Sequence, residues 1–368
     1  MKKKIYILIS GLLILTVFFT ACTPAATAPV DTPVAEEAVD EEAVDEVMEE
    51  TTPEITMKGI DKTVSAEEFG YEATPNGDYT VAIVVKSAAI PVWESHIIAA
   101  HKAGEELGVK VMDYSPAKAD NVEEQKRILE DLITAGVDCV VLAPANTEAV
   151  AGPVQDLIDA SIPVVYDNTM GPSDLDYLPF VGIDSIAAGN IIAKAIGDAM
   201  GGEGNLLVLE GKPGQSTSDL RTQGVMEYIA ENYPNIVAES VVTNWQFDEG
   251  RQVTEDYITK WGDALKGIVS VGGNQSEGAV EAVKAAGIEG ILIGGFDVQE
   301  PQYTAVEKGD EIFTISQSVY DQAYIGVVAC VYALNGEEVP NLITTPLNIV
   351  TLSNLEAMDE RPDALMKR

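Results

Sequence analysis

Acidic, amide and basic side chains recur in this chain directly after short apolar segments. The clearest case is residues 290–297, where an apolar run bounded by glycines ends in Asp297. Residues 162–168 have the same form and end in Asp167 and Asn168. Carboxylates and amides accept hydrogen bonds from hydroxyl groups, and apolar or aromatic walls complete most small-molecule sites. These side chains are therefore candidates for binding a small polyhydroxylated ligand such as a sugar.

Further polar and aromatic residues lie just past the ends of other predicted strands. A guanidinium donates to ring and hydroxyl oxygens, and indole faces cover the C–H surfaces of a sugar. A single Asp after a strand is commonly a helix N-cap, so the argument depends on all these residues converging at one edge of each sheet. The remaining candidates are Trp93, Arg221, Trp245, Phe247, Asn274 and Gln317.

Motifs of catalysis and of metal or cofactor binding are missing from the sequence. It holds neither a Gly-x-Ser-x-Gly elbow nor a Gly-x-x-x-x-Gly-Lys-[Ser/Thr] phosphate loop. The glycines at 201–204 precede a predicted strand, so they end a helix and do not bind a dinucleotide. His96 and His101 are five residues apart on one predicted helix, whereas metal pairs are four apart. We expect both at the surface or the edge of a cleft, and we expect no catalytic residue, metal or cofactor.

The elements that position the candidates alternate between strand and helix, and the alternation occurs twice. The first series is strand 80–85, helix 92–107, strand 109–114, helix 122–135, strand 139–143, helix 147–160 and strand 163–167. The second is helix 186–200, strand 205–210, helix 218–233, strand 236–243, helix 250–260, strand 267–271, helix 278–286, strands 290–297 and 313–317, and helix 321–334. This pattern predicts βαβ units and parallel sheets with helices on both faces. The predicted fold class is α/β, with two doubly wound parallel-sheet lobes and a ligand cleft at their C-terminal edges.

The N-terminal residues have the features of a bacterial lipoprotein signal. Lys2, Lys3 and Lys4 precede an apolar run at 5–19 that is short for a membrane-spanning helix. The run ends in Phe-Thr-Ala-Cys, which resembles a lipobox with Cys22 as the acylated residue. We therefore expect a signal peptide over residues 1–22 and a lipid-anchored protein outside the cytoplasm.

Residues 23–76 are rich in Ala, Thr, Pro and acidic side chains. Like charges with few aromatic residues do not collapse, so an acidic, disordered tether is expected here. The formal net charge of −38 for the whole chain argues against nucleic-acid binding, which needs basic patches. Cys139 and Cys330 lie in apolar segments, and although an extracytoplasmic setting permits a disulfide, we expect free buried thiols.

The chain resembles the periplasmic substrate-binding proteins of ABC importers, in the branch that contains the ribose-binding protein. The similarity covers residues 78–352 and is carried by Pro-Val-Trp at 91–93, Ala-Gly-Glu-Glu-Leu-Gly at 103–108, Ala-Pro-Ala-Asn at 143–146, Val-Gly-Ile-Asp at 181–184 and Gly-Phe-Asp at 295–297. The resemblance implies the type I periplasmic binding protein fold, with a three-strand hinge near 182–184, 317–319 and 348–351. The N-terminal lobe would then comprise 78–183 and 318–347, and the C-terminal lobe 184–317 and 348–356.

By the same resemblance the ligand residues would be Trp93, Asp167, Arg221, Asn274, Asp297 and Gln317, with Trp245 or Phe247 as a second stacking ring. The sequence departs from the family pattern at Ile90, at Asn168 and at Lys86, which occupies a place where a small polar residue is common. Ribose itself is therefore in doubt, and Lys86 joins the candidates as a residue that would suit an acidic group.

The resemblance implies a monomeric solute-binding protein that closes on a simple sugar and delivers it to an ABC permease. A sensor that passes the closed form to a chemoreceptor or histidine kinase remains the alternative, with the same fold and cleft. A transcription regulator would need an N-terminal DNA-binding segment where this chain has a lipoprotein signal, and an enzyme would need a catalytic motif.

Overall fold

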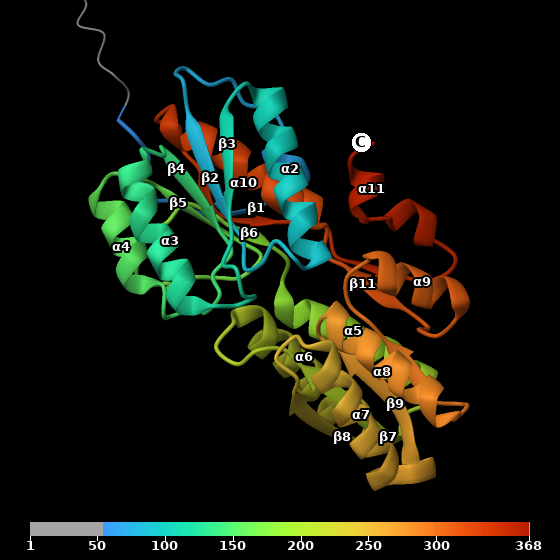
Figure 1. Cartoon of the computed structure of the whole chain (residues 1–368). Coiled ribbons are helices and arrows are strands. Elements are labelled where there is room, and N and C mark those ends of the chain that lie inside the picture. Colours follow the sequence, from blue (N-terminus) through green and yellow to red (C-terminus); the bar gives the residue numbers. More distant parts are fainter. Residues whose placement is uncertain (1–53, 368) are drawn as a thin grey trace, which may run out of the picture. The chain divides into compact units, whose positions relative to one another are not determined.

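The computed structural model describes residues 54–367, which contain two large sheets flanked by helices and a small two-stranded sheet (Figure 1). The first sheet has seven strands in the order β1-β12-β6-β5-β4-β2-β3, all paired in parallel. Its strands are β1 (Ile60–Ser65), β2 (Thr80–Val84), β3 (Lys110–Tyr114), β4 (Cys139–Leu142), β5 (Val164–Asp167), β6 (Phe180–Gly182) and β12 (Pro340–Thr344). The central strands β4 and β5 are wholly buried, which is why their sequences do not alternate between apolar and polar residues; the last residue of β5, Asp167, is the one charged position.

Helices cover both faces of this sheet and complete the N-terminal lobe. On one face lie α2 (Pro91–Leu107) and α10 (Val319–Leu334), and on the other α3 (Val122–Ala135) and α4 (Ala151–Asp159) (Figure 1). Pro91 begins α2, where a missing N–H costs nothing, and Gly108 ends it in the left-handed conformation at φ 77°. Local sequence signals therefore fix both ends of the helix that carries Trp93.

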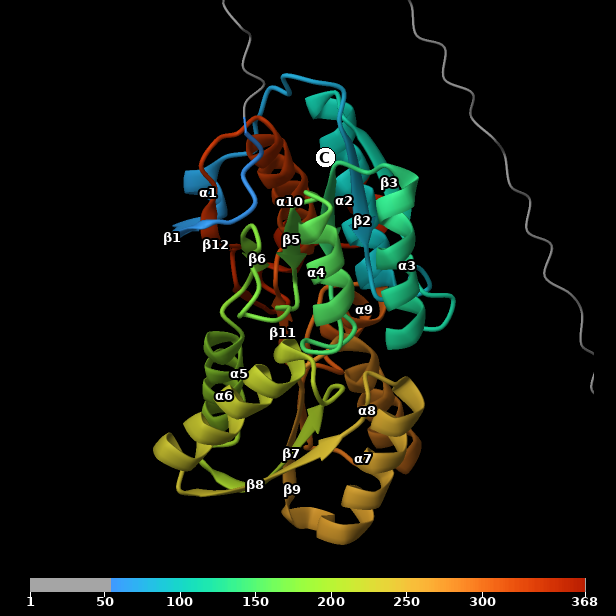
Figure 2. The same cartoon turned by 90° about the vertical axis from the view of Figure 1, so that its left-hand side faces the viewer.

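The second sheet forms the C-terminal lobe. Its four parallel strands are ordered β10-β9-β7-β8, from β7 (Glu203–Glu210), β8 (Asn235–Val242), β9 (Leu265–Ser270) and β10 (Leu292–Gly294). An antiparallel pair, β11 (Thr314–Ser316) with β13 (Asn348–Val350), adjoins β10 through a bridge between Gly294 and Phe313. Figure 2 shows α5 (Ser185–Ala199) and α6 (Ser216–Asn232) on one side of β7 and β9, with α7 (Phe247–Trp261) and α8 (Gly273–Ala286) on the other.

The chain passes between the lobes after β6, after β11 and after β12. Asp184 caps α5 at the first passage, and Ser318 lies at the second with φ 55°. The third passage falls at residues 345–347, since 348–350 already belong to β13, so it precedes the expected segment 348–351. Beyond β13 the chain forms a turn of 3-10 helix at Leu355–Met358 and then α11 (Pro362–Leu365), which packs against α2. The C-terminal segment thus returns to the N-terminal lobe, which the expected limit at residue 356 did not include.

The expected tether is wrong in its last part. Residues 60–65 form β1, which pairs in parallel with β12, and α1 (Ala66–Phe69) follows with the Ser65 side chain as its N-cap. The N-terminal lobe therefore includes residues that were assigned to the tether through residue 76. The predicted signal peptide, Cys22 and the tether through residue 53 lie outside the described residues.

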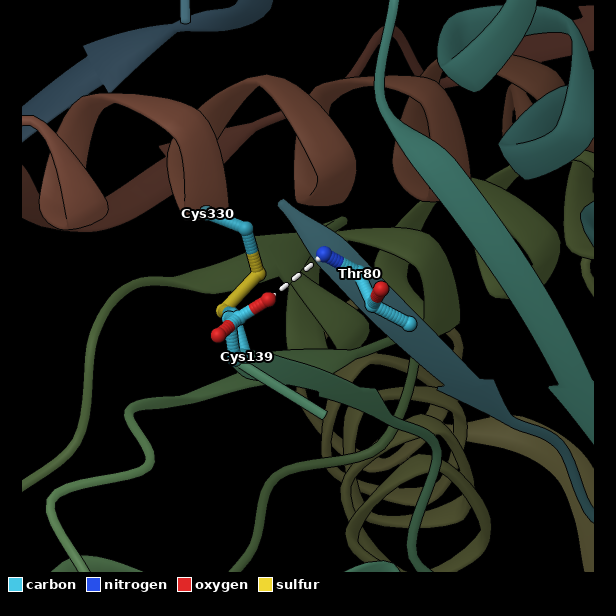
Figure 3. The surroundings of a disulfide bond; sticks show 4 residues. Thr80, Cys139 and Cys330 are labelled. Carbon is cyan, nitrogen blue, oxygen red and sulfur yellow. Dashed lines mark hydrogen bonds between the residues drawn. A yellow bond between two sulfur atoms is a disulfide. The ribbon is translucent and has the colours of Figure 1, made fainter. Parts of the chain in front are cut away.

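The expectation of free thiols is also wrong, because Cys139 and Cys330 form a disulfide (Figure 3). Cys139 begins β4 and Cys330 lies on α10, which crosses that face of the sheet, so their Cα atoms are 5.9 Å apart. The neighbouring Asp138 carboxylate accepts a hydrogen bond of 2.7 Å from the Thr80 backbone N–H, which ties β4 to β2. The disulfide therefore fastens α10 to a central strand of the sheet.

Within residues 54–367 we find no helix long and apolar enough to cross a bilayer.

Candidate functional site

A cavity of about 190 Å³ lies between the two lobes and is lined by both. It is smaller than the roughly 300–1,000 Å³ of sites for drug-sized molecules, which limits its occupant to a small ligand. Its lining residues are Lys86, Ile90, Pro91, Val92, Trp93, Asp120, Asn168, Gln215, Thr217, Arg221, Trp245, Gly272, Gly273, Asn274, Gln275, Glu277, Asp297, Gln299, Pro301, Gln302 and Gln317.

All but two of the residues predicted from the sequence line this cavity. Phe247 is the first residue of α7 and is not among the lining residues, whereas Trp245, two residues earlier, is. Asp167 is also absent from the lining, and its fully buried side chain lies near His96 of α2. Of the two aromatic candidates after β8, Trp245 is therefore the ring that faces the ligand space.

The C-terminal lobe contributes a hydrogen-bonded chain of three buried groups. Asp297, with φ 68°, follows β10, and its Oδ1 accepts from Gln317 Nε2 at 2.6 Å. Gln317 Oε1 accepts from Arg221 Nη2 at 2.8 Å, and the guanidinium lies 4.0 Å from the centre of the Phe296 ring. Burial raises the pKa of Asp297, against the field of Arg221, and burial lowers the pKa of Arg221 to about 10. Among the described residues, Arg221 Nε has no hydrogen-bond partner.

The N-terminal lobe contributes a buried ammonium. Lys86, just past β2, donates to Thr169 Oγ1 at 2.6 Å and to Gln215 Oε1 at 2.9 Å, and it lies 5.2 Å from the centre of the Trp93 ring. Burial lowers the pKa of Lys86 to about 7, although the charge of Asp120 opposes this. An ammonium has three N–H donors, so one remains for a ligand acceptor.

Gln215 joins the two lobes at the cavity wall. It follows β7 in the C-terminal lobe, and its Nε2 donates to Asp120 Oδ1 at 2.7 Å and to the Ala145 carbonyl at 2.9 Å, both in the N-terminal lobe. Its Oε1 accepts from Lys86 and also from Trp245 Nε1 at 2.8 Å. The described structure is thus a closed form in which one glutamine uses all its hydrogen-bonding positions.

Sequence reasoning missed Gln215 and Asp120 as site residues. Asp120 lies in the loop after β3 and Gln215 in the loop after β7, so both follow strands at the edge that supplied the other candidates. The same rule would have found them had it been applied to the longer loops. It would not have found Gln299 and Gln302, which lie beyond Asp297 around the start of α9 (Glu300–Lys308).

The two histidines were expected at the surface or at the edge of the cleft, and for His96 this is wrong. His96 is fully buried on α2, and its Nε2 lies 3.6 Å from Asp167 Oδ2. His101 is exposed and pairs with Asp113 at 2.7 Å. Residues 54–367 contain no group of three or more His, Cys, Asp or Glu side chains that could hold a metal ion.

Comparison with known proteins matches this geometry to a family. The model described as "Periplasmic binding protein domain" matches residues 81–338. The xylitol-binding protein of Mycolicibacterium smegmatis is 27% identical over 313 residues, which are 83% of this chain and 89% of that protein. The ribose import binding protein of Haemophilus influenzae is 28% identical over 297 residues, 80% of this chain and 100% of that protein.

A solved structure extends the likeness to three dimensions. It is an ABC transporter periplasmic solute-binding protein from Actinobacillus succinogenes with bound D-allose. It superposes with a TM-score of 0.72 at 25% identity and covers 76% of this chain and 100% of its own. With two parallel-sheet lobes, three passages between them and a cavity at the strand ends, this chain belongs to the periplasmic binding protein family and has its type I fold.

Proposed function

We propose that this protein is an extracytoplasmic solute-binding lipoprotein that captures a simple sugar or polyol and delivers it to an ABC permease. The observation that carries the proposal is the composition of the cavity wall. Both lobes supply buried hydrogen-bonding groups to one small space, and Trp93 and Trp245 supply indole rings. A sugar presents hydroxyl groups at its rim and C–H surfaces on its faces, and this wall complements both.

Lobe closure supplies the signal to the permease. A ligand shifts the balance between open and closed forms only by its differential affinity for the closed form. A ligand that contacts Lys86 and Asn168 on one lobe and Arg221 and Asp297 on the other has such a preference, because the open form separates the two sets. The binding step needs no bond-making chemistry.

Cys22 would anchor the protein to a membrane through a lipid, and the acidic residues after it would hold the lobes away from the bilayer. Anchoring raises the local concentration of the loaded protein near a permease in the same membrane. Mass spectrometry of the N-terminal peptide from membrane fractions tests this part, since an unmodified Cys22 would contradict it.

The test of ligand class is thermal unfolding of the purified protein against a panel of pentoses, hexoses, polyols and sugar acids. The protein is first unfolded and refolded to remove any carried ligand. A ligand that binds only the native state raises the unfolding midpoint by mass action, so one class should stand out. A rise in the unfolding midpoint with sugar acids alone would contradict the proposal that the ligand is a neutral sugar or polyol. No rise with any member of the panel would contradict the proposed function.

A further inference from the structure

His96 and Asp167 form a buried pair directly beneath the wall of the cavity. Both side chains have no exposed surface, and the only polar contact recorded between them is the 3.6 Å approach of His96 Nε2 to Asp167 Oδ2. Neither carboxylate oxygen of Asp167 has a hydrogen-bond partner within the described part of the chain. A bare carboxylate buried in this way would be strongly unfavourable.

The other ring nitrogen of His96 determines where protons can be. Nδ1 lies 2.8 Å from the carbonyl oxygen of Val92, which can only accept, so Nδ1 carries a hydrogen. A neutral imidazole has a single N–H, and Nε2 would then direct a lone pair at the lone pairs of Asp167. Two acceptors do not face each other in a buried site without a proton between them.

We propose that His96 and Asp167 share one additional proton, and that His96 thereby acts as a positioning residue for the ligand-binding wall formed by Trp93 and Lys86. The pair is then neutral overall, as an imidazolium whose Nε2 carries the proton toward the Asp167 carboxylate. The second half of this inference rests on the proposed function, whereas the shared proton does not.

The cavity wall depends on this pair in two ways. The His96 ring lies 4.9 Å from the Trp93 ring, and Trp93 lines the cavity. The charge of Asp167 also acts on Lys86, whose pKa it raises against the larger effect of burial. Loss of the shared proton would leave a buried negative charge beneath both residues.

The direction of the pH effect follows from the surroundings. Burial raises the pKa of Asp167 to about 6, and the charged groups that oppose this are His96 on α2 and Lys86 after β2. From the other lobe, Asp297 is the group that His96 acts on. In this closed form the pair has no exposed surface, and burial favours the protonated, neutral pair over the charged pair that remains when the shared proton is lost. A raised pKa in the closed form means that affinity is greatest at low pH and declines as the pH rises through that value.

Nitrogen NMR tests the shared proton without any ligand. The chain has only two histidines, so the exposed, cavity-distant substitution His101→Gln leaves His96 as the single source of ¹⁵N-histidine signals. At about pH 6 we expect proton-bearing signals from both ring nitrogens, and Asp167→Asn should remove the one at Nε2. A bare Nε2 in the otherwise native protein would overturn the proposal.

Ligand affinity tests the positioning role, using a sugar identified by the unfolding panel. His96→Asn has an amide that cannot hold the proton, so affinity should fall about tenfold more at about pH 8 than at about pH 5.5. The double variant His96→Asn with Asp167→Asn has no carboxylate to ionise at this position, so its affinity should depend on pH less steeply over that range than the affinity of His96→Asn. His101→Gln should follow the native profile.

If His96→Asn lost affinity equally at every pH, His96 would contribute to binding only through packing. That result would overturn the positioning role. Should His96→Asn fail to fold, Asp167→Asn alone decides the point, because its profile should be flatter than that of the native protein. No sugar response at all would contradict the proposed function, while the NMR result would still decide the shared proton.

Discussion

Gln215 of the C-terminal lobe donates to Asp120 of the N-terminal lobe across 2.7 Å, and neither side chain is appreciably exposed. The same glutamine accepts from Lys86, so a single amide bridges an acidic and a basic group of the opposite lobe. An open form would separate all these partners. The relationship marks Gln215 as a residue whose interactions belong to the closed state.

Gln215→Ala should therefore weaken ligand binding by about tenfold or more, because closure would leave Lys86 and Asp120 buried without their amide partner. Isothermal titration with a sugar from the unfolding panel measures the change. Gln223→Ala is the matched control, since Gln223 is an exposed residue of α6, the helix that begins directly after Gln215, and its side chain donates to Glu227. Equal affinities in the two variants would show that Gln215 does not contribute to closure.

Asp297→Asn should lower affinity about a hundredfold while leaving the fold intact. Asn tolerates the positive φ of this position, so the substitution removes the charge without adding backbone strain. It leaves the buried Arg221 without the carboxylate that favours its charge, and truncating a buried charge pair costs about 2–5 kcal/mol. Circular dichroism checks the fold, and Asp263→Asn, at an exposed site in the same lobe, is the control. If Asp297→Asn bound the ligand with native affinity, Asp297 would not contribute to ligand binding.

Lys86→Met should change how stability depends on pH in the unliganded protein. In the folded chain Lys86 has a pKa of about 7, below its ordinary value of 10.5, so the unfolded state binds more protons between these values. Stability should therefore rise with pH across this window in the native protein, and the variant should lack that contribution. Urea unfolding at a series of pH values measures the difference. Identical slopes in the two proteins would show that the Lys86 ammonium is not destabilised by burial.

The alternation of apolar strands and glycine-terminated helices predicted the two-lobe α/β architecture because each signal is local. β1 could not be found in this way, since five of its six residues are exposed and its partner β12 lies about 280 residues later in the chain. The disulfide was missed for a related reason. Its formation depends on how α10 crosses β4, and spacing in the sequence does not specify that crossing.

The sequence predicted which edge of each sheet carries the site, but it did not predict in which direction each side chain points. The rule that ligands lie past strand ends placed Asp297 and Trp245 on the cavity wall, but it placed Asp167 there too, and that side chain turns away toward His96. A residue at a strand end can face the cleft or the neighbouring helix. Only the packing of α2 decides between these outcomes for Asp167.

The disulfide should stabilise the fold without contributing to binding. Cys139 and Cys330 are 191 residues apart, and a cross-link over so long a loop removes much of the freedom of the unfolded chain. The double variant Cys139→Ala with Cys330→Ala should lose about 2–5 kcal/mol of unfolding free energy. Its sugar affinity should stay within about twofold of the native value, because neither cysteine lines the cavity. The direct check is to titrate thiols in the unsubstituted protein after it is unfolded without a reducing agent. If Cys139 and Cys330 both react, the disulfide does not form.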